Sequence, residues 1–335
     1  VDYYDTEDYV YEGKYRRGKR MKISPEIRIF VVCHKPAYVL ENPLLFPIQV
    51  GAALNAEHYP CMLYDDTGDN ISRKNPMYCE LTAQYWAWKN VDCDYYGFFH
   101  YRRYLSFADI YPVDSKGKLT VGKNPSPYLE LNTVWGNLEP YRLESQWMES
   151  VVKSYDLLTV LREKINTTVY RQYCQYHSEV DLKLILEIVK KTYPEYTRAA
   201  EQYMASKEIY YMNMYIMTKK LFHDYMEWLF TILREFEQQV ADCGRQLPPR
   251  QMGFLAERLF GIFYYYQREH GAQCAELAYL KFYNTEPGKE ECVSNIRTFR
   301  FKPTKFEIRI DMRKLNRAFP AGSRRRRILR SIFLR

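Results

Sequence analysis

The sequence has no long hydrophobic run. No stretch of about 18 apolar residues occurs, and the chain does not open with a charged segment followed by an apolar one. Neither a transmembrane helix nor a signal peptide is therefore predicted, and we expect a cytoplasmic protein. Hydrophobic residues still make up 47% of the 335 residues, which is enough for a large buried core and excludes a wholly disordered chain.

The cysteines also lack a pattern. Eight of them are scattered along the chain without CxxC spacing or a paired arrangement with histidines. This argues against a zinc site and against a disulfide framework, and it predicts reduced, structural thiols. Tyrosine, by contrast, is abundant, with 33 residues. Its rings can form platforms for carbohydrate, but filling the core as an amphipathic side chain is the expected role for most of them.

Positive charge is concentrated at the C-terminal end. From Arg297 onward there are fourteen Lys and Arg residues against two acids, whereas the net charge of the whole chain is +8. The segment "GSRRRRILRSIFLR" (322–335) combines this charge with apolar residues, as in a short segment that contacts an anionic membrane surface. A solvated, disordered tail is one alternative and nucleic-acid binding is another. Because no nucleic-acid-binding module accompanies the arginines, we expect no nucleic-acid partner.

Strand and helix patterns alternate through the first third of the chain. Strands are predicted at 27–35 and 61–69 and over "YYGFFHYRRYL" (95–105), and helices around 47–55 and 75–90. This order is typical of a doubly wound α/β fold, whose ligands bind beyond the carboxyl ends of the strands. We expect a single sheet with flanking helices, a helical C-terminal half and a basic tail. In that second half, strands are predicted at 154–161 and 210–217, and helices at 179–193, 219–240 and 252–270.

The stretch "FFHYRRYL" (98–105) places His100, Arg102 and Arg103 in an otherwise apolar strand. Burying a cation is costly unless an anion meets it, so we expect this strand end to receive an anion. Because side chains alternate along a strand, Arg102 and Arg103 cannot both point the same way unless the strand ends between them, so one is predicted to face the anion and the other to form a structural ion pair. The alternative is that both arginines pair with acids such as Asp65 or Glu80.

Residues 68–107, "GDNISRKNPMYCELTAQYWAWKNVDCDYYGFFHYRRYLSF", resemble the signature of bacterial capsular and O-antigen polysaccharide glycosyltransferases catalogued as domain of unknown function 4422. Later segments, "MNMYIM", "YMEWLFTIL" and "RQMGFLAERL", resemble the same family in the same order. The resemblance implies a GT-A-like glycosyltransferase domain over residues 23–285, between a polar leader (1–22) and a basic extension (286–335).

The same resemblance implies the substrates. It favours transfer of galactofuranose or galactose from a UDP-sugar to a lipid-linked glycan, in capsule, O-antigen or exopolysaccharide synthesis at the inner face of the cell membrane. The expected partners are therefore the UDP-sugar, the lipid-linked acceptor and, through the tail, the anionic membrane. The alternative function is a noncatalytic nucleotide- or carbohydrate-binding protein that keeps the fold and is tethered by its tail.

The resemblance also gives the anion an identity. Most GT-A enzymes hold the donor diphosphate with a metal bound by a DxD motif, which this strand end does not contain. Guanidinium groups can do the same electrostatic work, so we expect no cofactor. A Mn²⁺ or Mg²⁺ ion held by the acidic turn at 65–69 is the alternative. The donor-binding candidates are Asp65, Asp66, Asp69, Asn70, Glu80, Lys89, His100, Arg102 and Arg103.

A general base is needed if transfer inverts the anomeric centre, and its pKa should lie near the working pH. The candidates are Glu257 in "LAERL", and Asp181 and His177 in "YHSEVDL". Glu257 lies beside Arg258 on an apolar helix, which fits either a structural ion pair or a carboxylate aimed at the substrate. No Ser/His/Asp or Cys/His spacing indicates a hydrolase.

Overall fold

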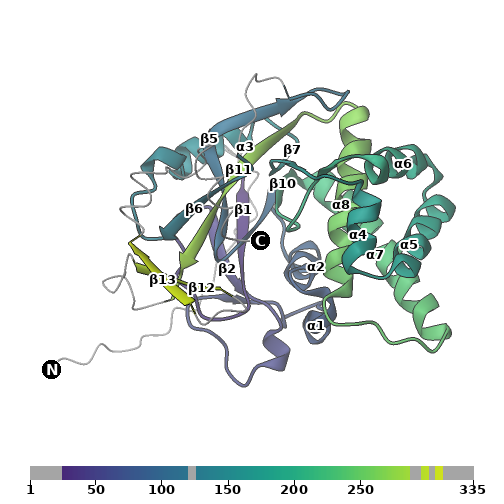
Figure 1. The fold of residues 1–335 in the computed structure, drawn as a ribbon, viewed down its shortest axis with the longest axis horizontal. Helices are drawn as coiled ribbons and strands as arrows, with labels where there is room; N and C mark the ends of the chain where they lie inside the picture. The colour runs from purple at the N-terminus through teal and green to yellow at the C-terminus, as the bar shows by residue number, and fades with distance from the viewer. Residues whose placement is uncertain (1–24, 120–125, 287–295, 302–305, 312–335) are drawn as a thin grey trace, which may run out of the picture.

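A computed structural model describes residues 25–119, 126–286, 296–301 and 306–311 (Figure 1). The expected leader and the basic segment at 322–335 lie outside these residues. The strands are β1 (Ile27–Cys33), β2 (Leu45–Gln49), β3 (Leu63–Tyr64), β4 (Tyr95–His100), β5 (Arg103–Val113), β6 (Tyr128–Thr133), β7 (Leu157–Val160), β8 (Glu163–Lys164), β9 (Glu208–Ile209), β10 (Tyr215–Thr218), β11 (Cys274–Asn284), β12 (Ile296–Phe301) and β13 (Phe306–Asp311).

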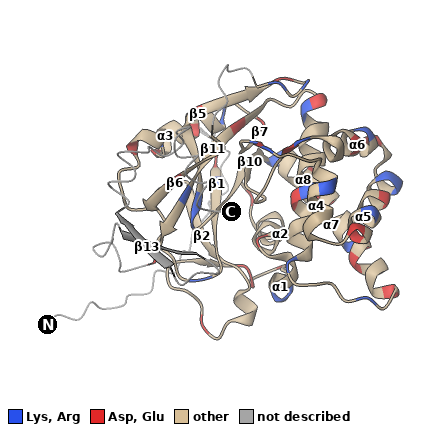
Figure 2. Cartoon of the chain, viewed as in Figure 1, with Lys and Arg blue, Asp and Glu red and all other residues tan. Residues whose placement is uncertain are grey.

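The helices gather mainly beside one part of the sheet, as Figure 1 shows for α4 to α8. Their outer faces carry most of the visible charge, whereas the sheet is largely uncharged (Figure 2). The α-helices are α1 (Asn75–Tyr78), α2 (Leu81–Asn90), α3 (Ser145–Val152), α4 (Val169–Tyr176), α5 (Glu179–Thr192), α6 (Thr197–Ala205), α7 (Lys219–Asp242) and α8 (Gln251–Glu269).

In the described part of the chain, nine strands form one mixed sheet in the order β10-β7-β11-β5-β4-β1-β2-β3, with β6 beside β11 and β10 also paired with β4. The strands β3, β2, β1 and β4 run parallel. Because β10 is antiparallel to both β4 and β7, β7 points the same way as β4. The carboxyl ends of β1 to β4 and of β7 therefore lie at one edge, which we call the carboxyl edge.

The core lies where α7 covers the centre of the sheet. The ring centroid of Phe98 in β4 lies 5.5 Å from the ring centroids of Phe30, Tyr215 and Phe222. The elements β1, β4, β10 and α7 therefore meet at this side chain. Thirteen of the 33 tyrosines belong to the buried core and ten more pack against it, which confirms the role expected for most of them. Seven cysteines are free in the described residues, as predicted, and Cys292 lies outside them.

Most of the strongly patterned segments have the predicted structure. The strand at β1 and the helices α5, α7 and α8 are confirmed, and α5 begins where expected because the Ser178 hydroxyl accepts a hydrogen bond from the amide of Asp181. Pro194 follows the end of that helix. Within the described residues, no helix is both long and apolar enough to span a bilayer.

The helix predicted around 47–55 is wrong, because Leu45–Gln49 forms β2 and only a short 3₁₀ turn follows it. Pro47 is tolerated there because β3 pairs with β2 only from Ile48 onward, so the proline stands at an open edge. The helix predicted over 75–90 is broken at Cys79, whose φ of +50° and ψ of −128° are not helical. Glu80 then begins the second piece, α2, with a new direction.

Candidate active site

Two arginines follow β4 at the carboxyl edge. Arg102 is exposed in the turn between β4 and β5, and Arg103 is half-buried at the start of β5. The Nε atom of Arg103 is buried and has no hydrogen-bond partner among the described residues. Burial and then the neighbouring Arg102 lower the pKa of Arg103. The predicted structural ion pair is not formed by either arginine within the described residues, so both charges remain available for an anion.

Further cations converge on the same place. Lys35 Nζ lies 5.7 Å and the Arg102 guanidinium carbon 5.8 Å from the ring centroid of Tyr101, so both stand by one ring. The pKa of His34 is lowered by burial and then by Arg102, Lys35 and Arg250. In the described residues, Lys35 and Arg250 have no ion pair either. Sequence reasoning missed them, although Lys35 comes two residues after the end of β1, where ligands of this fold class bind.

His100 is held as a neutral side chain. Its Nε2 lies 2.9 Å from the carbonyl oxygen of Met212 and donates to it. Burial, with Arg103 as the next cause, lowers the pKa of His100 to about 3. His100 therefore fixes the chain before β10 against the end of β4. It adds no charge to the cation group, by which we mean Lys35, Arg102, Arg103 and Arg250.

Two half-buried acids accompany the cations. Glu80 Oε1 accepts a hydrogen bond of 2.7 Å from Asn213 Nδ2, and Glu257 Oε1 accepts one of 2.7 Å from the amide of Met212. Burial raises the pKa of Glu80, and Arg250 and Arg103 are among the groups that counteract this. Burial also raises the pKa of Glu257, and Glu80 adds to that effect. The two carboxyl groups are thus held by adjacent residues of one short loop, and Glu80 lies near Arg250 and Arg103.

That loop is backbone-strained. Met212 and Asn213 have φ values of +79° and +49°, and Cys79 and Arg250 are also in the left-handed half of φ space, at +50° and +65°. Two contacts link these segments: Asn213 Nδ2 donates to the carbonyl of Gly253 over 3.2 Å, and the Arg250 amide donates to the carbonyl of Pro76 over 2.8 Å. Such strain in non-glycine residues costs about 1–3 kcal/mol each and is typical of functional sites.

In the acidic turn after β3, Asp65 has a structural role and Asp66 has an oxygen that is left for a ligand. Asp65 is fully buried and accepts hydrogen bonds from the amides of Gly51 and Ala52, at 2.9 and 3.0 Å, and from the Ser72 hydroxyl at 2.5 Å. It therefore shapes the turn. Asp66 receives a bond of 3.0 Å from His58, and its Oδ1 is buried without a partner among the described residues.

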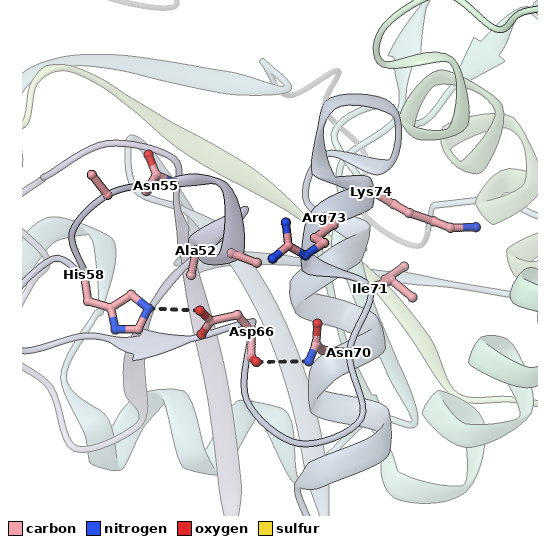
Figure 3. A pocket seen from close by; sticks show the side chains of 10 residues that line it. Ala52, Asn55, His58, Asp66, Asn70, Ile71, Arg73 and Lys74 are labelled. Atoms are coloured by element: carbon pink, nitrogen blue, oxygen red, sulfur yellow. Dashed lines mark hydrogen bonds and ion pairs between the residues drawn. The ribbon is translucent and has the colours of Figure 1, made fainter.

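A cavity of about 680 Å³ opens beside Asp66 (Figure 3). Asn70 joins its wall and donates to the backbone carbonyl of Asp66 over 3.0 Å. Arg73 is another wall residue and is exposed. The full lining is Ala52, Ala53, Asn55, Ala56, His58, Asp66, Asn70, Ile71, Arg73 and Lys74. Donor and acceptor groups at the ends of β2 and β3 suit a nucleoside, and Asp66 and Asn70 are the two predicted residues that belong here.

Lys89 and Asp69 lie elsewhere. Lys89 stacks on Trp88 with Nζ 3.3 Å from the ring centroid, near the end of α2. The amide of Asp69 donates to Asn90 at that same helix end. Since α2 leads into the amino end of β4, the six residues of β4 separate this place from Arg103 by roughly 17–20 Å. The structure does not bring Lys89 or Asp69 to the cations.

Two of the three base candidates are packing residues of the helical part. Asp181 accepts hydrogen bonds from Arg245 at 2.7 Å and from Gln251 at 3.0 Å. The His177 ring stands 4.3 Å from that of Phe254, and burial and then Arg258 lower the pKa of His177. Of the three, only Glu257 joins the cations and Glu80. It also receives a hydrogen bond of 3.3 Å from Arg258.

The acidic turn at 65–69 is the alternative place for a metal ion. Among the described residues, no group of three or more His, Cys, Asp and Glu side chains is placed to hold a metal ion. Asp65, the first acid of the turn, already uses both oxygens in hydrogen bonds to protein groups.

Comparison with known proteins shows which family and which fold this chain resembles. The family whose sequence model matches the chain is described as "Domain of unknown function (DUF4422)", and the match covers residues 28–269. A solved structure of a WbbM bifunctional glycosyltransferase in its apo state is similar, with a TM-score of 0.68 and 32% sequence identity over 78% of this chain and 46% of that one. The chain thus spans less than half of that protein's length. No curated protein matches. The similarity identifies the mixed sheet and its helices as a GT-A-like fold.

Proposed function

The chain belongs to the family described as domain of unknown function DUF4422, and from this premise and its GT-A-like fold we propose that it is a glycosyltransferase that uses a nucleoside-diphosphate sugar. The observation that carries the proposal is the cation group of Lys35, Arg102, Arg103 and Arg250. These side chains meet at the carboxyl edge, and none of them forms an ion pair within the described residues. A diphosphate is the anion whose size and charge suit several such groups.

The cations supply the main catalytic effect. When the bond between the sugar and the diphosphate breaks, negative charge grows on the leaving phosphate oxygens. Guanidinium groups stabilise that charge through hydrogen bonds that strengthen in the transition state. The half-buried position of Arg103 makes its contribution larger than that of an exposed arginine, because water screens it less. The loop at Met212 and Asn213 keeps Glu80 and Glu257 next to this group.

The finer substrate assignment rests on family resemblance and on composition. We propose a UDP-sugar donor, with galactofuranose or galactose favoured, and a lipid-linked glycan as acceptor in capsule, O-antigen or exopolysaccharide synthesis. The cavity beside Asp66 supports a nucleoside at the ends of β2 and β3. We further propose a cytoplasmic protein held at the inner membrane face by the basic tail, and transfer that needs no metal.

The test is a screen of purified protein with UDP-galactofuranose, UDP-galactose and UDP-glucose and a lipid-linked acceptor, with release of UDP as the readout. The proposal expects UDP release with at least one donor, dependent on the acceptor, and a large loss in an Arg102→Ala/Arg103→Ala double variant. Binding of a UDP-sugar without turnover would instead support the noncatalytic alternative. Absence of both binding and turnover for all three donors would refute a UDP-sugar enzyme.

A further inference from the structure

Glu163 is a carboxylate at the carboxyl edge that sequence reasoning did not single out. It begins the two-residue strand β8, three residues after the end of β7, whose carboxyl end lies at the same edge as Arg103. Its strand partner is Ile209 of β9, and the chain runs on from there into the strained loop at Met212. Topology therefore brings Glu163 to the edge where the cations and Glu257 are found; β7 and β10 lie side by side in Figure 1.

The register of β5 and β11 places Glu163 relative to the cations. Arg103 stands directly opposite Lys281, so their side chains share one face of the sheet, and Tyr279, two residues earlier on β11, shares it too. The charges of Glu163 and Arg103 both act on the pKa of Tyr279, and the charge of Lys281 acts on the pKa of Glu163. These four side chains are therefore neighbours. Glu163 and Arg103 thus both lie near Tyr279 at the carboxyl edge.

The partners of Glu163 differ from those of the other two acids. Glu80 is bound by Asn213, and Glu257 by the Met212 amide and Arg258. Glu163 is half-buried, and its side chain has no hydrogen bond and no ion pair with any described residue. Neither carboxylate oxygen of Glu163 is among the buried atoms without a partner, so the carboxylate of this half-buried residue reaches the surface and is open to hydroxyl groups of a ligand.

We propose that Glu163 binds the reacting hydroxyl of the acceptor sugar and takes its proton; this inference rests on the proposed function. In the step, the acceptor oxygen forms a bond to the anomeric carbon while its proton moves to the Glu163 carboxylate. The bond from that carbon to the diphosphate oxygen breaks, and its electron pair leaves with the nucleoside diphosphate, next to the cations. The protonated Glu163 then returns its proton to water. Tyr211, which is half-buried and beside Glu163, supplies ring surface for the acceptor sugar.

The pH dependence has a definite sign. Burial and then Glu257 raise the pKa of Glu163, while Lys281 counteracts them. The charged and titratable groups beside it are Glu257 of α8, Lys281 and Tyr279 of β11, and Tyr211. Because the base must be ionised, the rate should increase as pH rises through this raised pKa, which gives an acid limb in the profile of kcat.

The experiment compares Glu163→Gln, Glu257→Gln and a control, Glu187→Gln, which changes an exposed acid on α5. For Glu163→Gln we expect kcat to fall by about 10²- to 10⁴-fold, the acid limb to disappear and the Kd for UDP to stay within about twofold. Added formate should restore part of the activity of Glu163→Ala, as only a missing base allows. Glu187→Gln should behave like the wild type.

Three results would overturn the inference. One is a kcat within about threefold of the wild type in Glu163→Gln, with its acid limb kept. The second is loss of the acid limb in Glu257→Gln alone, which would make Glu257 the base. The third is a Glu163→Ala variant that formate does not rescue. Inactivity of the wild type with every donor would instead refute the proposed function itself, and the inference with it.

Discussion

Replacing Arg103 by Met should raise the stability of the free protein while lowering its activity. Methionine keeps a stem of similar length but removes the charge and the buried Nε donor, which has no partner among the described residues. A buried donor without a partner costs about 1–3 kcal/mol, and Arg102 adds repulsion. Because Arg103 is only half-buried, we expect a gain near the lower end, about 1 kcal/mol, which corresponds to about 2 °C in Tm for a domain of this size.

The catalytic effect has the opposite sign. Loss of one charged hydrogen-bonding group from the leaving phosphate should cost about 2–4 kcal/mol of transition-state stabilisation, or about 30- to 700-fold in kcat/KM. The stabilisation of the wild type by UDP should shrink as well, because it follows the ratio of ligand concentration to Kd. Replacing a residue that only supports the fold would lower stability and activity together. Higher stability with lower activity in Arg103→Met would therefore indicate a role in binding the diphosphate.

The assay is thermal unfolding with and without UDP, together with steady-state kinetics, for Arg103→Met and a control, Arg28→Met. Arg28 lies at the amino end of β1 and is paired with Glu26 through a hydrogen bond of 2.7 Å, so its loss should leave kcat/KM within about twofold. An Arg103→Met protein that unfolds at a lower temperature and keeps kcat/KM within about threefold would refute the reasoning.

Three further outcomes are expected. Asp65→Ala leaves the amides of Gly51 and Ala52 without an acceptor, so the free energy of unfolding measured in urea should fall by about 3 kcal/mol; unchanged stability would contradict a structural role. Activity should persist in excess EDTA. Loss of activity that Mn²⁺ or Mg²⁺ reverses would instead indicate a metal ion bound at the acidic turn. Deleting residues 322–335 should reduce cosedimentation with anionic liposomes but keep turnover of a water-soluble acceptor; equal binding of both proteins would exclude the tether.

The parts of the fold that were predictable from sequence are those with one dominant pattern. The β-branched run of β1 and the apolar spacing of α5, α7 and α8 each outweigh local exceptions. The strand β2 was missed because Pro47 argues against a central strand, and only the shortness of its neighbour β3 makes it acceptable. The break at Cys79 depends on contacts with distant residues, which no local pattern reveals.

The candidate site was predictable in part for a similar reason. Arg102 and Arg103 stand out because cations are rare in an apolar strand, but Arg250 and Glu163 have ordinary polar neighbours in the sequence. They reach the carboxyl edge only through the positions of α8 and β8. Asp65, Asp181 and His177 have chemically suitable side chains, yet their contacts are with protein groups.

The pairing of β10 between β4 and β7 also determines when the protein can fold. Until residues 215–218 have left the ribosome, the apolar strand β4 has an unpaired edge beside Phe98, and an open edge of this kind promotes aggregation. Contacts between residues so distant in sequence also slow folding, because the intervening loop must close first. Nascent chains that stop before β10 should therefore depend on chaperones, and no cut between β4 and β10 should yield two pieces that fold independently.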